Sequence, residues 1–265
     1  MGAKYSYEEF ARRLGAEDDP KLNAAADFTA RLLNGPLGER VMRVILFGSV
    51  ARGEAHPGSD VDVMVFADAP RRALAGPASS AAWETTLAWA ESLEHLLYPL
   101  GDLVQPRSYV VYNALKRGRE IYGMPETEIR RREAWNLFEK ANHHWLQSQT
   151  VMRAGAFELA IVGACTAAEL AAKALLLLKE GVDLPSTHGG PMQIFGREYI
   201  LTGEAPAAWG QLLRQHLEVR RLALYDTTVK AMTAADAQPV LDLARDMLDF
   251  LQNKLSQLSE AEEQT

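Results

Sequence analysis

The spacing of apolar residues changes character near residue 125, and this change is the strongest constraint on the fold. Before it, β-branched runs at 41–47 and 60–66 alternate with turn residues and with helical spacing at 22–33 and 81–97. This mixture is typical of an α/β unit. After it, the long stretches show only helical spacing. We therefore expect an α/β (α+β) domain with a small mixed sheet, followed by an all-α helical-bundle domain.

The turn Gly-Met-Pro-Glu at 123–126 marks the boundary, because glycine interrupts regular structure and proline disfavours helix at the residue before it. A chain of 265 residues is long enough for two ordinary domains. We place an N-terminal extension at 1–20, the first domain at 21–124 and the helical domain at 125–265. Within the first domain we expect a long polar turn at 48–59, and the segments 101–106 and 108–112 predict short strands or turns.

Composition points to an ordinary globular protein of a reducing compartment. The lone Cys165 excludes an internal disulfide framework and a Cys-rich zinc module. The charged N-terminus has no apolar segment of the signal-peptide type. The most apolar stretch, 156–178, contains Glu158, Glu169 and Lys173, which favours a buried helix over a membrane span. We expect a cytoplasmic protein with no membrane partner.

The net charge of −7 disfavours a general nucleic-acid coat, which depends on neutralising phosphates with basic residues. Local basic patches leave RNA open as a partner.

Two carboxylates lie two residues apart at the start of the second expected strand. Asp60 and Asp62 alternate with Val61 and Val63, so both acids face one side, roughly 7 Å apart, and both valines face the core. Like charges on one face repel, and a hard cation such as Mg²⁺ relieves the repulsion. A bare D-x-D is more often a solvated strand face, but the loop before it favours a site.

That loop has the composition of a phosphate-binding turn. Gly48 follows the first strand directly and lets the backbone approach a ligand closely. Ser49 adds a hydroxyl beside backbone N–H groups that can hold phosphate oxygens. No Gly-Lys-Ser/Thr ending is present, so this is not a Walker A loop.

These residues resemble the nucleotidyltransferase superfamily related to DNA polymerase β, and in particular the minimal nucleotidyltransferases. The resemblance covers about residues 22–123. The family pattern of a strand, G-S-x-x-x-G, a spacer and S-D-x-D is met by Gly48, Ser49, Gly53, Ser59, Asp60 and Asp62. Arg52 falls where many members carry a basic residue, with a plain surface role as the alternative.

The resemblance implies metal-dependent transfer from a nucleoside triphosphate. Asp60 and Asp62 would bind Mg²⁺, with Mn²⁺ as the alternative ion. The residues implied at the nucleotide are Gly48, Ser49, Arg52, Gly53 and Ser59. Members of the family also need a third carboxylate on a neighbouring strand, to complete the metal site and help deprotonate the acceptor. Asp102 is our candidate, with a turn residue after Gly101 as the alternative.

The helical half is similar, over about residues 131–255, to HEPN domains, which are helical partners of minimal nucleotidyltransferases. The apolar helix from Phe157, the run RRLALYD at 220–226 and a closing amphipathic helix carry the similarity. It implies a homodimer and a cleft formed by Glu169, Lys173, Arg220, Arg221, Tyr225 and Asp226. Glu169 and Lys173 are spaced i, i+4, so a purely structural ion pair is the alternative.

Active HEPN ribonucleases carry an arginine followed, after four to six residues, by a histidine. Here Arg221 leads to Tyr225 and Asp226, and the last histidine of the chain, His216, precedes it. The ribonuclease dyad is therefore missing.

We predict a nucleotidyltransferase that moves a nucleoside monophosphate, AMP from ATP, to a hydroxyl of a small molecule or a protein. The helical domain is expected to help form the acceptor pocket. The alternative is a toxin–antitoxin or phage-defence module whose HEPN part is degenerate as a ribonuclease. A third interpretation, a non-catalytic nucleotide-binding module, is disfavoured by the intact Asp60 and Asp62.

Overall fold

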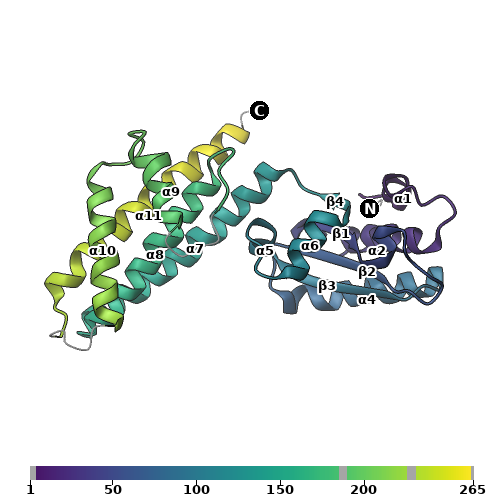
Figure 1. Cartoon of the computed structure of the whole chain (residues 1–265), viewed down its shortest axis with the longest axis horizontal. Coiled ribbons are helices and arrows are strands. Elements are labelled where there is room, and N and C mark those ends of the chain that lie inside the picture. Colours follow the sequence, from purple (N-terminus) through teal and green to yellow (C-terminus); the bar gives the residue numbers. More distant parts are fainter. Residues whose placement is uncertain (1–3, 185–189, 226–230, 264–265) are drawn as a thin grey trace. The chain divides into compact units, whose positions relative to one another are not determined.

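A computed structural model describes residues 4–184, 190–225 and 231–263. The chain divides into two compact units, Met1–Ile129 and Arg130–Thr265. Figure 1 shows a sheet with flanking helices in the first unit and long packed helices in the second. This confirms the predicted fold class.

The first unit is built on a four-stranded mixed sheet in the order β3-β2-β1-β4. The strands are β1 (Val41–Phe47), β2 (Val61–Ala67), β3 (Leu93–Pro99) and β4 (Arg119–Gly123). β1 pairs antiparallel with β2 and β4, whereas β2 and β3 run parallel. Parallel neighbours need a crossover connection, and the helix α4 (Arg71–Trp89) supplies it.

Helices cover both faces of the sheet. The remaining helices of this unit are α1 (Tyr7–Leu14), α2 (Pro20–Asn34), the short 3₁₀ turn η1 (Gly38–Arg40), α3 (Gly48–Arg52), α5 (Leu100–Val104) and α6 (Tyr109–Arg117). Val61, Val63 and Val65 pack with α1, α2 and α4 in one apolar core. Met64 and Phe66 pack with α5 and α6 in a second core on the other face. The alternation along β2 thus separates the two layers.

Three local expectations were wrong. Residues 48–52 form α3 instead of a polar turn, because Gly48 and Gly53 bound a single helical turn that is too short to show periodicity. The end of the expected helix at 81–97 is the strand β3. The segments expected as short strands or turns at 101–106 and 108–112 belong largely to α5 and α6, where Ser108 caps α6 by accepting a hydrogen bond from the Val111 N–H.

The N-terminal residues take part in the first unit. Phe10 and Leu14 of α1 are buried in the core beneath α2. At the other end, Ile129 still packs in the second core of this unit. For this reason the compact units divide at 129/130, a few residues after the turn at 123–126.

The regular elements of the second unit are all helices within its described residues. Its helices are α7 (Glu126–Arg153, which starts in the first unit), α8 (Phe157–Leu177), α9 (Gly190–Phe195), the π-helical turn η2 (Gly196–Ile200), α10 (Ala208–Tyr225) and α11 (Ala234–Glu263). α8 packs against α10 and α11. By length and composition alone α8 is apolar enough to cross a membrane, but most of it is buried inside this unit.

Candidate functional site

Acidic side chains from two adjacent strands lie in one row across the sheet. Asp62 on β2 is paired in register with Glu94 on β3 and, on its other side, with Phe47 on β1. Phe47, like Met64 and Phe66, belongs to the face covered by α5 and α6. Asp60 lies immediately before β2, two residues from Asp62, so by alternation it faces the same side. The structure therefore brings Asp60, Asp62 and Glu94 to one end of one face.

Gly48 closes over this row at the end of β1. Its φ of 73° lies in the left-handed region, and a β-carbon there would stand 2.0 Å from Oδ2 of Asp62. Only a glycine can hold the backbone against that carboxylate. The bend also turns the chain into α3, which carries Ser49. The Ser49 hydroxyl has no hydrogen-bond partner among the described residues.

Within the acidic row, ionisation of Asp62 is less favourable than usual. Burial raises the pKa of Asp62 above its ordinary value, and the negative charges of Glu94 and Asp60 raise it further, whereas Arg52 lowers it. A bound cation would stabilise the ionised form of such a carboxylate, because it offsets both the burial and the neighbouring negative charges. The row thus has the charge character of a cation site.

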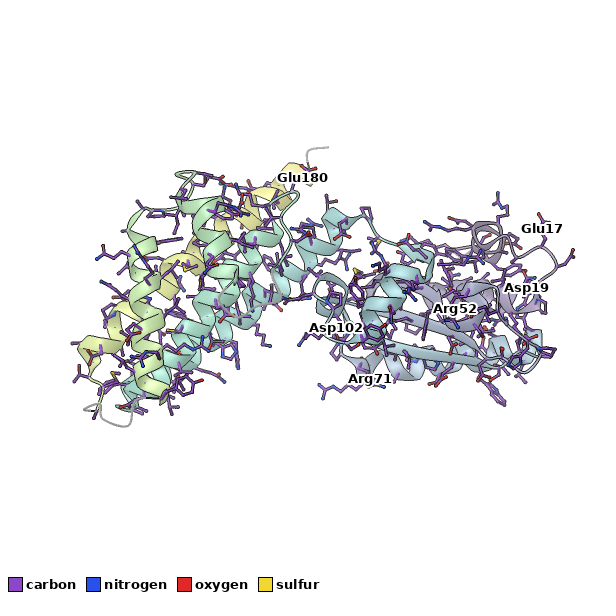
Figure 2. The ribbon with its side chains drawn as sticks, in the orientation of Figure 1. Glu17, Asp19, Arg52, Arg71, Asp102 and Glu180 are labelled. Atoms are coloured by element: carbon purple, nitrogen blue, oxygen red, sulfur yellow. The ribbon has the colours of Figure 1, made fainter. Side chains whose placement is uncertain are left out.

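Asp102, the third carboxylate predicted from the sequence, lies elsewhere. It follows the far end of β3, in α5 and not on a strand, whereas Glu94 is the second residue of β3. Pro99 lies five residues after Glu94 along the strand, or roughly 16 Å away. Figure 2 shows Asp102 and Arg52 apart along the strands. Asp102 instead accepts a hydrogen bond from Nε of Arg107 at 3.0 Å.

Glu94 was missed by the sequence reasoning. Its exposed carboxylate stands on an edge strand, but the run Leu93-Glu94-His95-Leu96 lacks the strict apolar–polar alternation that would mark that strand in the sequence. Leu93 and Leu96 fall on opposite faces, which is strand behaviour. The same leucines also fit the helical spacing of the preceding segment.

The other predicted nucleotide residues, Gly53, Ser59 and Arg52, make contacts within the domain. Gly53 ends α3 in the left-handed conformation, φ 71°, and its N–H caps the helix. The Ser59 hydroxyl accepts a hydrogen bond from the His56 N–H at 3.0 Å and so holds the turn before Asp60. Nε of Arg52 lies 2.7 Å from Oε2 of Glu54, and both side chains are exposed.

A pocket of about 360 Å³ adjoins the row on the same face of the sheet, between α3 and α6. Its walls include Gly48, Ala51 and Arg52 from α3, and Tyr109, Asn113 and Arg117 from α6. Its size lies within the range of small-molecule sites. Within the described part of the chain, the charged side chains that line it are both arginines.

The residues of the row suit a divalent cation by donor type. Carboxylate oxygens are the ligands that Mg²⁺ and Mn²⁺ prefer. Within the described part of the chain, no three His, Cys, Asp or Glu side chains are assembled as a finished metal cluster. The fit therefore depends on the charge and the shared face of Asp60, Asp62 and Glu94, not on a closed coordination shell.

The helical unit assembles part of the predicted cleft. Glu169 lies 3.0 Å from Nζ of Lys173 and 3.4 Å from Nη1 of Arg220. Arg221 pairs instead with Glu218 at 2.6 Å, and Tyr225 is largely exposed at the end of α10. Asp226 lies outside the described residues.

A buried histidine stands beside this pair. His216 is 5% exposed, and neither ring nitrogen has a hydrogen-bond partner within the described residues. Burial lowers its pKa and raises that of the Cys165 thiol to about 12. The cavity that they line with Glu169 and Arg220 measures only about 10 Å³, room for about one water molecule.

Comparison with known families gives two matches. The family model for the nucleotidyltransferase domain matches residues 33–129, and that for the HEPN domain matches residues 134–255. No curated protein matches the chain. The first match contains the whole acidic row and the Gly48 bend, and the second contains the Glu169–Arg220 pair. The predicted fusion is confirmed: the chain carries a nucleotidyltransferase domain followed by a HEPN domain.

Proposed function

We propose that the first domain transfers a nucleoside monophosphate, AMP from ATP, to a hydroxyl group of a small molecule or a protein. One observation carries the proposal above all others. Asp62 on β2, Glu94 on β3 and Asp60 just before β2 share one end of one sheet face, beside the Gly48 bend that leads into α3, which carries Ser49. Such a row is suited to binding a divalent cation and a polyphosphate together.

Asp60, Asp62 and Glu94 are the proposed ligands of Mg²⁺ or Mn²⁺. When bound, the metal supplies charge neutralisation and a Lewis acid for phosphoryl oxygens. The raised pKa of Asp62 supports this assignment, because burial and then the negative charges of Glu94 and Asp60 disfavour its ionised form, which a bound cation would stabilise.

The protein's own groups then bind and orient the substrate. The backbone N–H groups at Gly48 and Ser49, with the Ser49 hydroxyl, hold the oxygens of the β and γ phosphates. The acceptor oxygen forms a bond to the α-phosphorus while the bond to the bridging oxygen breaks, and its electron pair leaves with pyrophosphate. Glu94, exposed on the edge strand, receives the proton of the acceptor hydroxyl. Most of the rate enhancement in such a site is positional and electrostatic.

Pyrophosphate release tests the proposal. The full-length protein is incubated with Mg²⁺ and each labelled nucleoside triphosphate in turn, with panels of hydroxyl-bearing small molecules and proteins, including the chain itself. Asp62→Ala should abolish the release seen with the wild type, and Asp102→Asn should leave it nearly unchanged. Equal rates for the wild type and Asp62→Ala would show that the acidic row is not the site.

The tandem of domains supports a second candidate, an RNA-related defence or toxin–antitoxin module. Arg220 is held by Glu169 at 3.4 Å in the HEPN domain, which keeps one cation in place beside the buried His216. RNA cleavage by the purified protein, lost in Arg220→Ala or Arg221→Ala, would support it. Intact RNA after prolonged incubation would contradict this second candidate and leave nucleotidyl transfer as the one proposed activity.

We further propose a homodimer formed through the HEPN domain. Leu217, Leu224 and Tyr225 of α10 are exposed apolar side chains in this unit. Sedimentation of the wild type as a dimer, and of Leu217→Glu as a monomer, would support the pairing.

A further inference from the structure

The pocket between α3 and α6 has the charge of an anion site. Among the residues that the structure describes, Arg52 and Arg117 are the only charged ones that line it, and no carboxylate does so. The net charge of the protein is −7, so a pocket lined by two guanidinium groups and no carboxylate among the described residues differs in charge from the molecule as a whole. A polyanion is the ligand that complements it.

Arg117 is the unengaged cation of the two. Nε of Arg52 donates to Glu54 at 2.7 Å. Arg117, at the last position of α6, forms no ion pair or side-chain hydrogen bond with any described residue. The side-chain amide of Asn113, one turn earlier on α6, is likewise without a partner in the described chain. Both polar groups are therefore available to a ligand.

The position of the pocket identifies which part of a substrate would reach it. The acidic row occupies β2 and β3, and Phe47 of β1 lies both beside Asp62 in the sheet and in the pocket wall. Gly48 adjoins both the acidic row and the pocket, because it contacts Asp62 and also lines the pocket. Adjacent strands are about 4.8 Å apart. In the proposed function the β and γ phosphates are held at Gly48 and Ser49, which places them on the side of the acidic row where Arg117 lines the pocket.

We propose that Arg117 binds the β and γ phosphates of the nucleoside triphosphate and holds the pyrophosphate that leaves. This inference rests on the proposed function. When the bond between the α-phosphorus and the bridging oxygen breaks, that oxygen gains negative charge on the pyrophosphate side. A guanidinium offers paired N–H donors to phosphate oxygens, which a lysine ammonium cannot match in geometry. Asn113 supplies a neutral donor on the same wall.

Lys116 provides a matched control. It precedes Arg117 on α6 and carries the same charge, but its Nζ lies 3.4 Å from the Tyr112 hydroxyl and it does not line the pocket. Lys116→Ala and Arg117→Ala therefore remove one positive charge each from neighbouring positions, and only one of them faces the pocket.

Calorimetric binding to the full-length protein tests the proposal directly. The probes are magnesium pyrophosphate, α,β-methylene ATP and AMP. Arg117→Ala should weaken binding of pyrophosphate and of the ATP analogue about tenfold, the loss expected for one hydrogen bond to a charged group. Binding of AMP should change less than about twofold, since AMP lacks the phosphates in question. Arg117→Lys should restore part of the affinity, and Lys116→Ala should match the wild type.

Two outcomes would overturn the inference. One is that Arg117→Ala binds pyrophosphate as tightly as the wild type does. A wild type that binds no pyrophosphate counts as the same outcome. The other is an equal loss of AMP and pyrophosphate, which would place Arg117 at the nucleoside. The proposed function fails separately, if pyrophosphate binds in an Arg117-dependent way while Asp62→Ala still releases pyrophosphate at the wild-type rate.

Discussion

A β-carbon on Gly48 would lie 2.0 Å from Oδ2 of Asp62, so the end of β1 and the acid on β2 meet in a contact that only glycine permits. Gly53, at the other end of α3, has nearly the same backbone conformation, but nothing lies within 4 Å of its virtual β-carbon. Substitutions at the two glycines therefore distinguish the effect of backbone strain from the effect of contact with the acidic row.

We expect Gly48→Ala to abolish transfer and Gly53→Ala to preserve most of it. Both variants strain a positive φ, at a cost of about 1 kcal/mol of stability. Only the first displaces the Asp62 carboxylate. Pyrophosphate release and thermal unfolding, measured on both proteins, check this. Comparable activity in the two variants would show that the contact with Asp62 is dispensable.

Glu94→Gln should reduce turnover by about a hundredfold or more, the scale of losing one electrostatic group of an active site. Asp102→Asn should reduce it by less than about twofold, because Asp102 lies at the other end of β3 and pairs with Arg107. Steady-state rates with saturating Mg²⁺ decide between them. The reverse ranking would restore Asp102 as the third carboxylate.

Asp62→Asn should stabilise the first domain when divalent ions are chelated. The pKa of Asp62 is raised in the folded state, so its ionised form weakens the fold at neutral pH, and the penalty disappears as the pH falls through the folded pKa. We expect the midpoint of thermal unfolding to rise by about 2 °C in EDTA. Added Mg²⁺ should raise the midpoint of the wild type and not that of the variant.

Lys21→Met should destabilise the first domain by about 3 kcal/mol. The buried Lys21 ammonium pairs with Glu91 and donates to the Ser59 carbonyl at 2.7 Å, so it fixes the turn just before Asp60. Removing it leaves a nearly buried carboxylate without its partner. Urea unfolding measures the loss, and the double variant with Glu91→Leu should recover much of it. A single variant as stable as the wild type would contradict the buried pair.

His216→Phe should flatten the pH dependence of stability of the HEPN domain. Burial lowers the pKa of His216 below 6.5, so the unfolded chain binds the proton more readily than the folded one. The stability is complete above pH 6.5 and falls as the pH falls toward the folded pKa. The slope for one such group is at most about 1.4 kcal/mol per pH unit. Chemical unfolding of both proteins from pH 8 to 5 gives the difference, and parallel curves would exclude His216 as its source.

The paired acids of β2 could be read from the sequence because one short rule decides their direction. Val61 and Val63 are apolar and alternate with Asp60 and Asp62, and strand alternation alone places the acids on one face. The valines are fully buried in the first core, as that rule requires.

Glu94 could not be predicted in the same way, because no residue in the sequence marks the end of α4, the helix before it. α4 ends at Ala90, whose φ of 54° is a left-handed conformation that glycine usually marks. With alanine there, the leucines that follow continue the helical spacing and hide β3. The parallel pairing of Asp62 with Glu94 is moreover a long-range contact made through a crossover, which local periodicity does not contain.

The crossover has a consequence for partly synthesised or clipped chains. A fragment that ends within α4 retains the glycine bend and both acids of β2 but has no β3, and so it lacks the carboxylate that stands opposite Asp62. Nucleotide chemistry at this site would therefore begin only once the edge strand has docked, which makes catalytic competence a late event in the maturation of the domain.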